Sequence, residues 1–374
     1  MNILFVTELE PFPPDRGERI RSYNLIKSML KFSSRLIMVA GNAPPVEQKY
    51  SHLRYLKFPG AYVRNRWVNL LLLFIRRKGM TTLLKEVVAS ESVDLVFIDY
   101  NFLGQYIRFF KKRGIKVIYG THNVQSELNY QRPVRGLKER FYQRMRFCLE
   151  RQHENRYFKS ADILLGVSEA DLDYYRRTMK PTRSFLVPNY IDEEEYMGYG
   201  SAKKKNQVIM TGNFNAFQNH AGLRWFLEDI WDEDLAELAE LVIAGHGSKE
   251  HFLQVQQGKA FPGSVKALGS VEDLRGLIAE SKAAIIPLKH GSGTRLKCIE
   301  AMALKTNIIS TTLGVEGIRH NGSIYIADDA DEFKKGLILI LKGEVNHADE
   351  AFRVFMDEYS LRSNTPRLKS ILQT

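Results

Sequence analysis

With 374 residues, 44% of them hydrophobic, the chain is long enough to form about two globular domains, each with its own core. The N-terminus lacks the pattern of a signal peptide, and the densest apolar run, 68–75, is far shorter than the roughly 20 residues that span a bilayer, so neither export nor a membrane span is expected. The formal net charge of +11 indicates an anionic partner. The two cysteines lack CxxC spacing and so indicate neither a disulfide framework nor a zinc site, and this cysteine usage favours a reducing cytoplasm.

Short runs rich in Val and Ile alternate with longer segments whose apolar residues are three and four apart. The first half contains five such runs, which we predict to be buried strands: 2–7, 35–40, 94–100, 116–121 and 162–168. The segments between them, such as 18–32 and 101–114, are long enough for crossover helices. Repeated β-α-β units predict a parallel sheet with helices on both faces.

The stretch 185–206 interrupts this alternation with Pro188, two glycines and a run of charges, so we predict the domain boundary there. Strand patterns then resume at 207–212, 240–245, 264–269, 282–288, 307–311 and 323–327. The expected fold is α/β, with two tandem, Rossmann-like, doubly wound parallel-sheet domains facing a cleft. The predicted domains are 1–190 and 191–374, with the last helix free to pack back on the first domain.

Charge is distributed unevenly between the two predicted domains. Residues 1–190 contain 33 Lys and Arg against 17 Asp and Glu, whereas residues 191–374 contain 21 against 26. The first half therefore suits nucleic acid, a phosphorylated substrate or an anionic membrane surface. Its basic residues cluster at 64–79 and 132–156, and a solvated basic surface without a partner remains the alternative.

The residues that directly follow the predicted strands should form the binding sites, because open parallel sheets bind ligands beyond the carboxyl ends of their strands. In residues 290–318 a glycine-containing turn leads into a predicted helix that starts near Thr294 and carries Arg295, Lys297 and Glu300. A helix N-terminus beside an arginine and a lysine suits a diphosphate.

Glu300 lies about one turn behind these cations, where a carboxylate can accept hydrogen bonds from both hydroxyls of a ribose. The alternative is an ordinary Lys297–Glu300 pair on an exposed helix, which contributes a few tenths of a kcal/mol. The residues alone leave both interpretations open.

At this point the sequence resembles the retaining glycosyltransferases of family 4, which have the GT-B fold of two Rossmann-like domains. The resemblance is carried by six segments in the family's order: PFPPDRGERIRSYNLIKSML, THNVQSE, ADILLGVSEAD, VPNYID, TGNFNAFQNHAGLRWF and GSGTRLKCIEAMALKTNIISTTLGVEGI. It implies a glycosyltransferase that moves a sugar from a nucleoside-diphosphate sugar to a lipid-linked or glycan acceptor in capsule, lipopolysaccharide or exopolysaccharide synthesis.

The same resemblance assigns roles to individual residues. Arg295 and Lys297 would stabilise the donor diphosphate during the reaction, Glu300 would bind the ribose, and His122 would lie beside the reacting sugar. The remaining donor-binding residues that it implies are Gly17, Gly212, Asn213, Ser292, Gly293 and Thr294. By itself, Gly17 is equally a turn glycine and His122 a strand-end histidine with a backbone partner.

Two departures from the family pattern matter for the donor site. Ser292 stands where many members have the first of two glutamates that read the sugar hydroxyls, and the Arg and Lys that many relatives carry after the first strand of the second domain are absent. We expect backbone N–H groups and Ser292 to bind the sugar, and Arg295 and Lys297 to replace the missing cations.

No cofactor and no metal are expected, because fixed cations can stabilise the leaving diphosphate and no DxD pair follows a strand. The expected partners are the nucleotide-sugar donor, a lipid-linked or glycan acceptor and, peripherally, the anionic inner face of the cell membrane. Trp67 and the leucines after it, flanked by Arg76, Arg77 and Lys78, suit an interfacial segment, although a core-facing helix with charged ends explains them equally. Nucleic acid is not an expected partner.

Two alternative functions remain open. A nucleotide-sugar 2-epimerase can have the same fold but needs carboxylates near the donor sugar and releases an isomerised sugar nucleotide. A basic, non-catalytic scaffold would explain the charge without any turnover.

Overall fold

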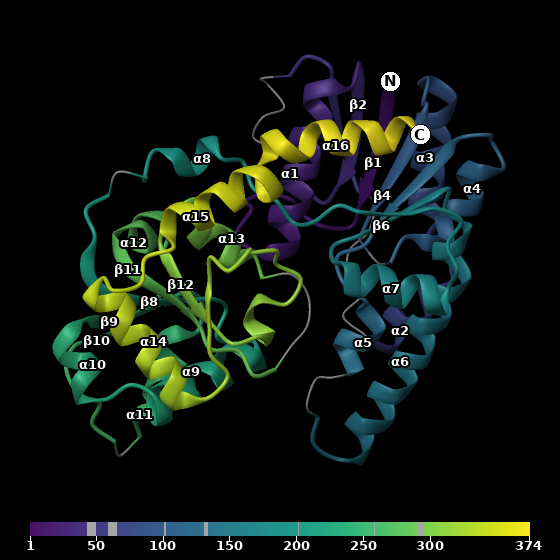
Figure 1. The fold of residues 1–374 in the computed structure, drawn as a ribbon. Helices are drawn as coiled ribbons and strands as arrows, with labels where there is room; N and C mark the ends of the chain where they lie inside the picture. Colours follow the sequence, from purple (N-terminus) through teal and green to yellow (C-terminus); the bar gives the residue numbers. More distant parts are fainter. Residues whose placement is uncertain are drawn as a thin grey trace. The chain divides into compact units, whose positions relative to one another are not determined.

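The computed structural model describes residues 1–42, 50–58, 66–100, 102–130, 134–200, 202–257, 259–290 and 295–374. These residues form two compact units, each built around one parallel sheet (Figure 1). The first unit comprises residues 1–189 and 364–374, and the second comprises residues 190–363. The second unit therefore ends before the chain does.

The first unit contains a seven-stranded sheet in the order β3-β2-β1-β4-β5-β6-β7. All its pairings are parallel, and the strands are β1 (Asn2–Thr7), β2 (Arg35–Ala40), β3 (Leu53–Lys57), β4 (Leu95–Asp99), β5 (Lys116–Gly120), β6 (Ile163–Gly166) and β7 (Ser184–Leu186). The sequence predicted the five inner strands. It missed β3 and β7 because these are the two edge strands, where polar residues interrupt the continuous apolar pattern of a buried strand.

The helices of the first unit connect these strands. They are α1 (Gly17–Phe32), α2 (Arg66–Leu71), α3 (Lys78–Ser90), α4 (Ile107–Lys111), α5 (Gln125–Tyr130), α6 (Leu137–Tyr157) and α7 (Glu169–Thr178), with short 3₁₀ turns at Gly104–Tyr106 and Phe158–Ser160. None of the helices in the described part of the chain has the length and apolarity needed to cross a bilayer.

The second unit contains a six-stranded parallel sheet in the order β10-β9-β8-β11-β12-β13. Its strands are β8 (Lys205–Thr211), β9 (Glu240–Ala244), β10 (Val265–Gly269), β11 (Ser281–Ile286), β12 (Asn307–Ser310) and β13 (Tyr325–Ile326). Its helices are α8 (Glu194–Met197), α9 (Phe217–Asp229), α10 (Glu233–Leu238), α11 (Ser248–Gln256), α12 (Arg275–Glu280), α13 (Leu296–Ala303), α14 (Ala330–Lys342) and α15 (Ala348–Val354), followed by a π-helical turn at Phe355–Tyr359.

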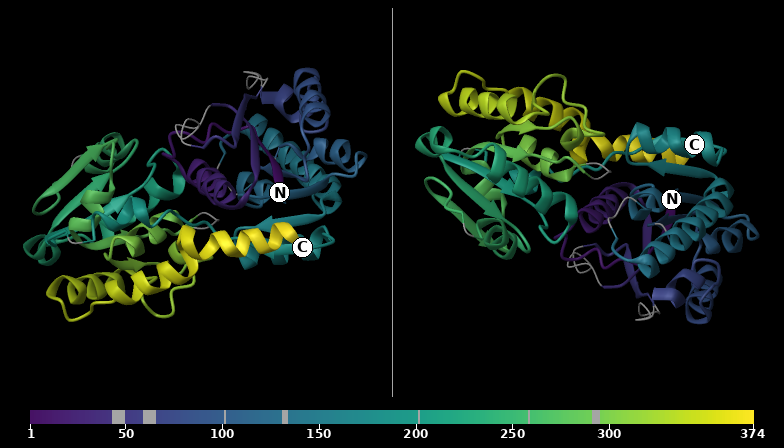
Figure 2. Two further views of the ribbon diagram at one scale, coloured as in Figure 1. Left: turned by 90° about the horizontal axis from the view of Figure 1, so that it is seen from above. Right: turned by 90° about the horizontal axis from the view of Figure 1, so that it is seen from below.

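The last helix, α16 (Leu361–Gln373), returns the chain to the first unit, and both views of Figure 2 show its end, in yellow, beside that unit. Its buried Leu368 and Leu372 supply apolar contact, and Thr365 Oγ1 donates a hydrogen bond to Ser28 Oγ in α1 at 3.0 Å. Lys116 Nζ also donates to the Leu372 carbonyl at 2.9 Å. These contacts explain why 364–374 belong with 1–189.

In each sheet the strand order reverses beside the first strand of the unit, between β1 and β4 in one and between β8 and β11 in the other. Ligands of open parallel sheets bind outside the carboxyl ends of the strands at such a switch point. Ligand-binding residues are therefore expected directly after β4 in the first unit and directly after β8 in the second.

Candidate active site

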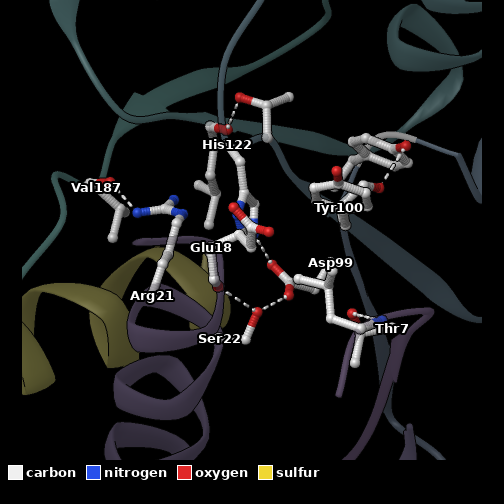
Figure 3. A network of polar contacts seen from close by, with 12 residues as sticks. Thr7, Glu18, Arg21, Ser22, Asp99, Tyr100, His122 and Val187 are labelled. Atoms are coloured by element: carbon white, nitrogen blue, oxygen red, sulfur yellow. Dashed lines mark hydrogen bonds and ion pairs between the residues drawn. The ribbon is translucent and has the colours of Figure 1, made fainter. Parts of the chain in front are cut away.

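In the first unit a buried row of three polar side chains lies at the carboxyl ends of β4 and β5. Asp99 is the last residue of β4, and its Oδ1 lies 2.8 Å from Nε2 of His122, two residues after β5. Asp99 Oδ2 accepts a hydrogen bond from the Ser22 hydroxyl at 2.5 Å. Figure 3 shows the three residues joined in this order. Helix α1 is thus bonded to the switch point of the sheet.

Asp99 determines what His122 can do chemically. A carboxylate only accepts hydrogen bonds, so Nε2 carries the donated proton and Nδ1 is left with its lone pair in the neutral ring. Nδ1 is buried and has no partner among the described residues. The Nδ1 lone pair of the neutral ring can therefore accept a hydrogen bond, and the backbone partner considered as an alternative does not occur among the described residues.

Tyr100 follows Asp99 with a strained backbone. Its φ of +79° lies in the left-handed region that non-glycine residues rarely adopt, and its ring packs edge-on against His122 with the centroids 5.2 Å apart. Strain of this kind persists where the surroundings over-determine it, which often happens at functional sites. Tyr100 thus forms one wall beside the imidazole (Figure 3).

The sequence predicted His122 and Gly17 for this unit and missed Asp99 and Ser22. Gly17 is the first residue of α1, the same helix that carries Ser22. A signal for Asp99 was present, since an acid ends the otherwise apolar strand 95–99 at the edge where ligands bind. No comparable signal marks Ser22, whose partner lies 77 positions away.

In the second unit two cations meet at the start of α13. This helix begins at Leu296, with Arg295 as its N-cap residue, and Lys297 follows in the first turn. Arg295 is buried, Lys297 is partly buried, and the Lys297 ammonium bonds to an amide oxygen, Asn219 Oδ1, at 2.9 Å. This partner is neutral, and no described carboxylate forms an ion pair with Lys297.

Burial acts on both cations, and the charge of Arg295 acts in addition on Lys297. Desolvation, followed by the charge of Arg295, lowers the pKa of Lys297 to about 8. Desolvation likewise lowers the pKa of Arg295. A bound anion would reverse both effects, because it restores favourable electrostatics to two desolvated positive charges. The pair is therefore suited to an anion such as a diphosphate.

Glycines let the backbone approach this cation pair closely. Gly212 has a φ of +154°, and a Cβ there would lie 3.0 Å from Asn219 Nδ2 and 3.3 Å from Lys297 Nζ. Asn219 Nδ2 in turn donates to the Asn213 carbonyl at 2.8 Å. The turn after β8, with Gly212 and Asn213, is thereby held against Lys297; the donor-binding roles of both residues stay a prediction.

Glu300 has a different partner from the one that a simple helix pair would give it. The hydroxyl of the buried Tyr196 in α8 donates to Glu300 Oε1 at 3.1 Å, and no ion pair joins Glu300 to Lys297 among the described residues. Burial raises the pKa of Glu300, an effect that the Tyr196 hydrogen bond and the Lys297 charge partly offset. The second carboxylate oxygen has no hydrogen-bond partner among the described residues, and no local sequence pattern marks Tyr196 as the partner of the first.

Tyr196 is itself held by Arg275, the first residue of α12. The Arg275 guanidinium lies over the Tyr196 ring, 5.7 Å from its centroid, and pairs with Asp273 at 2.9 Å. The residues Ser292, Gly293 and Thr294, predicted as part of the donor site, lie outside the described residues.

Comparison with known proteins agrees with this architecture. A family model described as Glycosyltransferase Family 4 matches residues 21–195, and one described as Glycosyl transferases group 1 matches residues 205–343. A Klebsiella pneumoniae protein described as an uncharacterized 44.6 kDa protein in a cps region is 25% identical over 224 residues. That alignment covers 58% of this chain and 55% of the relative, so it spans only about half of the relative's length.

Solved structures share the fold at low sequence identity. Sucrose-phosphate synthase from Thermosynechococcus elongatus superposes with a TM-score of 0.76 at 14% identity, over 100% of this chain and 98% of that one. A glycosyltransferase from Rickettsia africae gives 0.68 at 14% identity over 99% and 97%, and Anabaena HepE in complex with UDP gives 0.67 at 12% identity over 100% of both chains.

Proposed function

The chain belongs to the family 4 glycosyltransferases of the GT-B fold, and we propose that it transfers a sugar from a nucleoside-diphosphate sugar to a lipid-linked or glycan acceptor with retention of anomeric configuration. The observation that carries the donor part is the desolvated pair Arg295 and Lys297, and the Lys297 ammonium bonds to an amide oxygen within the described part of the chain. A solved neighbour of the same fold, Anabaena HepE, holds UDP, which supports a nucleotide donor here.

Departure of the nucleoside diphosphate is the difficult step, because negative charge develops on the phosphate oxygens. Fixed, desolvated cations stabilise that charge without having to reorganise, and removal of one such group typically costs about 3 kcal/mol of transition-state stabilisation. In this proposal Arg295 and Lys297 fill that role, Glu300 binds the ribose, and neither a metal nor a cofactor takes part.

The acceptor side of the proposal rests on the first unit. His122 offers Nδ1 to a sugar hydroxyl while Asp99 holds its other nitrogen. In a retaining reaction the acceptor proton can pass to the departing phosphate, so no protein base is assigned. The relative in a cps region supports a place in the synthesis of a surface polysaccharide.

A lipid-linked acceptor would bring the first unit to a membrane surface on the cytoplasmic side. Helices α2 and α6 contact each other, and both carry exposed apolar side chains. These side chains are Trp67, Val68 and Leu71 on α2 and Leu137 and Phe141 on α6. Arginines and lysines accompany them in both segments. This combination favours reversible attachment to anionic lipid.

The proposal is tested by a thermal-shift panel of UDP-, GDP-, ADP- and dTDP-sugars against the full chain and against Lys297→Met. We expect one nucleotide class to raise the Tm of the wild type and to lose most of this effect in the variant. NMR of the product then separates the remaining functions: a retained anomer linked to acceptor supports transfer, an isomerised sugar nucleotide identifies an epimerase, and no response to any donor contradicts the proposal.

A further inference from the structure

A basic hollow lies in the first unit, in a place that the sugar-transfer residues do not use. It has a volume of about 550 Å³ and lies between α3 and α4, which neighbour each other in Figure 1. Four cationic side chains line it: Arg76, Lys78, Lys85 and Arg113. The remaining lining residues are Thr81, Thr82 and Phe109, so the hollow has no acidic wall.

The cations of this hollow form no ion pairs with the described part of the chain. Among the described residues neither Arg76, Lys78 nor Lys85 pairs with a carboxylate. Arg113 donates to the Phe109 carbonyl at 2.9 Å and lies over the Phe109 ring, 3.9 Å from its centroid. The Phe109 ring and carbonyl thus orient one guanidinium that lines the hollow, and no described carboxylate pairs with it.

Arg77 differs from Arg76 and Lys78, with which the sequence analysis grouped it, because it forms an ion pair. Arg77 is directed inward, where it pairs with the buried Glu8 at 3.7 Å and lies near the Phe58 ring. Desolvation raises the pKa of Glu8 to about 7, and the charge of Arg77 partly offsets this rise. Arg77 therefore neutralises a buried carboxylate, whereas the adjacent Arg76 and Lys78 line the hollow.

Phosphate is the anion that best fits this set of groups. Two guanidinium forks can bind its oxygens bidentately and two ammonium groups add point charges, whereas the Thr81 hydroxyl already donates to the Arg77 carbonyl at 2.9 Å. The chain just before the hollow carries the exposed Leu71 and Ile75, with 61% and 56% of their surface accessible. Exposed apolar residues beside a phosphate-binding group are suited to a lipid surface rather than to a free ion.

We propose that Arg76, Lys78, Lys85 and Arg113 form a binding site for the phosphate of an anionic lipid headgroup. The proposal deepens the membrane part of the proposed function and rests on it. Each of these cations near an anionic surface is expected to strengthen binding about fivefold. The site should also distinguish phosphate from other anions, which a diffuse basic surface would not do.

The test is co-sedimentation of the full chain with vesicles of phosphatidylcholine that contain either phosphatidylglycerol or oleate, adjusted to equal zeta potential. The hollow variant is Arg76→Ser, Lys78→Ser and Lys85→Ser together. The matched control is Lys159→Ser, Arg176→Ser and Arg177→Ser, which removes the same charge from exposed positions of the same unit. We expect the hollow variant to bind phosphatidylglycerol vesicles more than tenfold more weakly, and the control to change less than about threefold.

Three outcomes would overturn the proposal. Equal losses in the two variants, or equal wild-type binding to phosphatidylglycerol and oleate vesicles, would show diffuse attraction only. Calorimetric binding of inorganic phosphate that the hollow variant abolishes, with its vesicle binding intact, would identify the ligand as free phosphate.

Donor-induced thermal shifts separate this proposal from the proposed function. They should be the same in the wild type and in the hollow variant, which also shows that the variant is folded. If no donor shifts the wild type but the phosphatidylglycerol preference holds, glycosyl transfer is contradicted and the headgroup site stands.

Discussion

Asp99 and His122 are joined by a 2.8 Å hydrogen bond at the carboxyl ends of two adjacent strands, and both side chains are almost fully buried. The parallel register pairs Asp99 with Gly120, two residues before His122, so the β4–β5 ladder itself brings the carboxylate to the imidazole. The bond orients His122 and determines which of its nitrogens is free for a substrate.

Asp99→Asn should reduce the rate of sugar transfer while leaving donor binding intact. An amide in place of the carboxylate no longer enforces the Nε2-protonated ring, and misplaced acid–base or hydrogen-bonding groups typically lower kcat about 10²- to 10⁴-fold. Steady-state kinetics gives kcat, and calorimetry with the nucleoside diphosphate gives donor affinity. Ser22→Ala, which leaves the Asp99–His122 bond in place, is the matched control and should cost much less. A full rate in Asp99→Asn would make the pair purely structural.

Binding of the nucleoside diphosphate should weaken above about pH 8. The pKa of Lys297 in the free protein is about 8, and a bound diphosphate raises it, so at higher pH binding must take up a proton. Affinity then falls by up to about tenfold per pH unit above this value. Calorimetry from pH 6.5 to 9.5, in buffers of different ionisation enthalpy, measures both affinity and proton uptake.

Lys297→Met is the control for this pH dependence. It should bind more weakly at pH 7 and lose the decline above pH 8, since the titrating group is gone. If the variant retains the same decline, another group is responsible and Lys297 does not contact the diphosphate.

Tyr196→Phe should weaken nucleoside diphosphate binding about fivefold, in line with a hydrogen bond contribution of about 1 kcal/mol. The Tyr196 hydroxyl orients Glu300 and lowers its pKa, so its loss leaves the carboxylate less well placed and more readily protonated. The deficit should increase as pH falls, because burial raises the pKa of Glu300 and protonation removes one acceptor oxygen from the ribose.

Glu300→Gln and Tyr199→Phe are the positive and the negative control for this prediction. Glu300→Gln removes the carboxylate and should weaken binding at least as much, without the additional loss at low pH that protonation of Glu300 causes. Tyr199 bonds to Asp273 and not to Glu300, so Tyr199→Phe should leave affinity within about twofold. Equal effects of the two tyrosine substitutions would contradict a specific Tyr196–Glu300 link.

Glu154→Gln should change the pH dependence of stability. Burial raises the pKa of Glu154 to about 7 from the usual value near 4.5, so the folded state keeps a proton that the unfolded state loses in this interval. Glu154 therefore makes the wild type less stable as pH rises from about 4.5 to 7. Relative to wild type, the Tm of Glu154→Gln should increase over this range and level off above pH 7.

The contacts of Glu154 supply a second readout. Its carboxylate accepts hydrogen bonds from the Ser126 backbone N–H at 3.1 Å and from the Ser126 hydroxyl at 2.6 Å, which holds α5 shortly after His122. Ser126→Ala removes the hydroxyl hydrogen bond, which lowers the pKa of Glu154, so it should lower Tm and make the loss of stability with rising pH larger than in the wild type. A constant Tm difference between Glu154→Gln and wild type at all pH values would contradict the elevated pKa.

The sequence alone determined the α/β architecture with its parallel sheets, because buried strands and crossover helices impose local patterns that recur along the chain. The inner strands at 2–7 and 35–40 lie where they were predicted. Edge strands such as Leu53–Lys57 were not predicted, because one side of an edge strand meets solvent and polar residues interrupt its apolar run. The basic character of residues 1–190 likewise follows from composition alone.

Only the tertiary structure decided which side chains are partners. Ser22 meets Asp99 across 77 positions, Lys297 meets Asn219 across 78, and Tyr196 meets Glu300 across 104. The sequence offered Lys297 and Glu300 as neighbours on one helix, yet each bonds to a residue of another element. The physical reason is that local periodicity specifies which face of an element is buried, whereas the partner of a buried polar group depends on strand register and on how distant elements pack, and no local pattern encodes these.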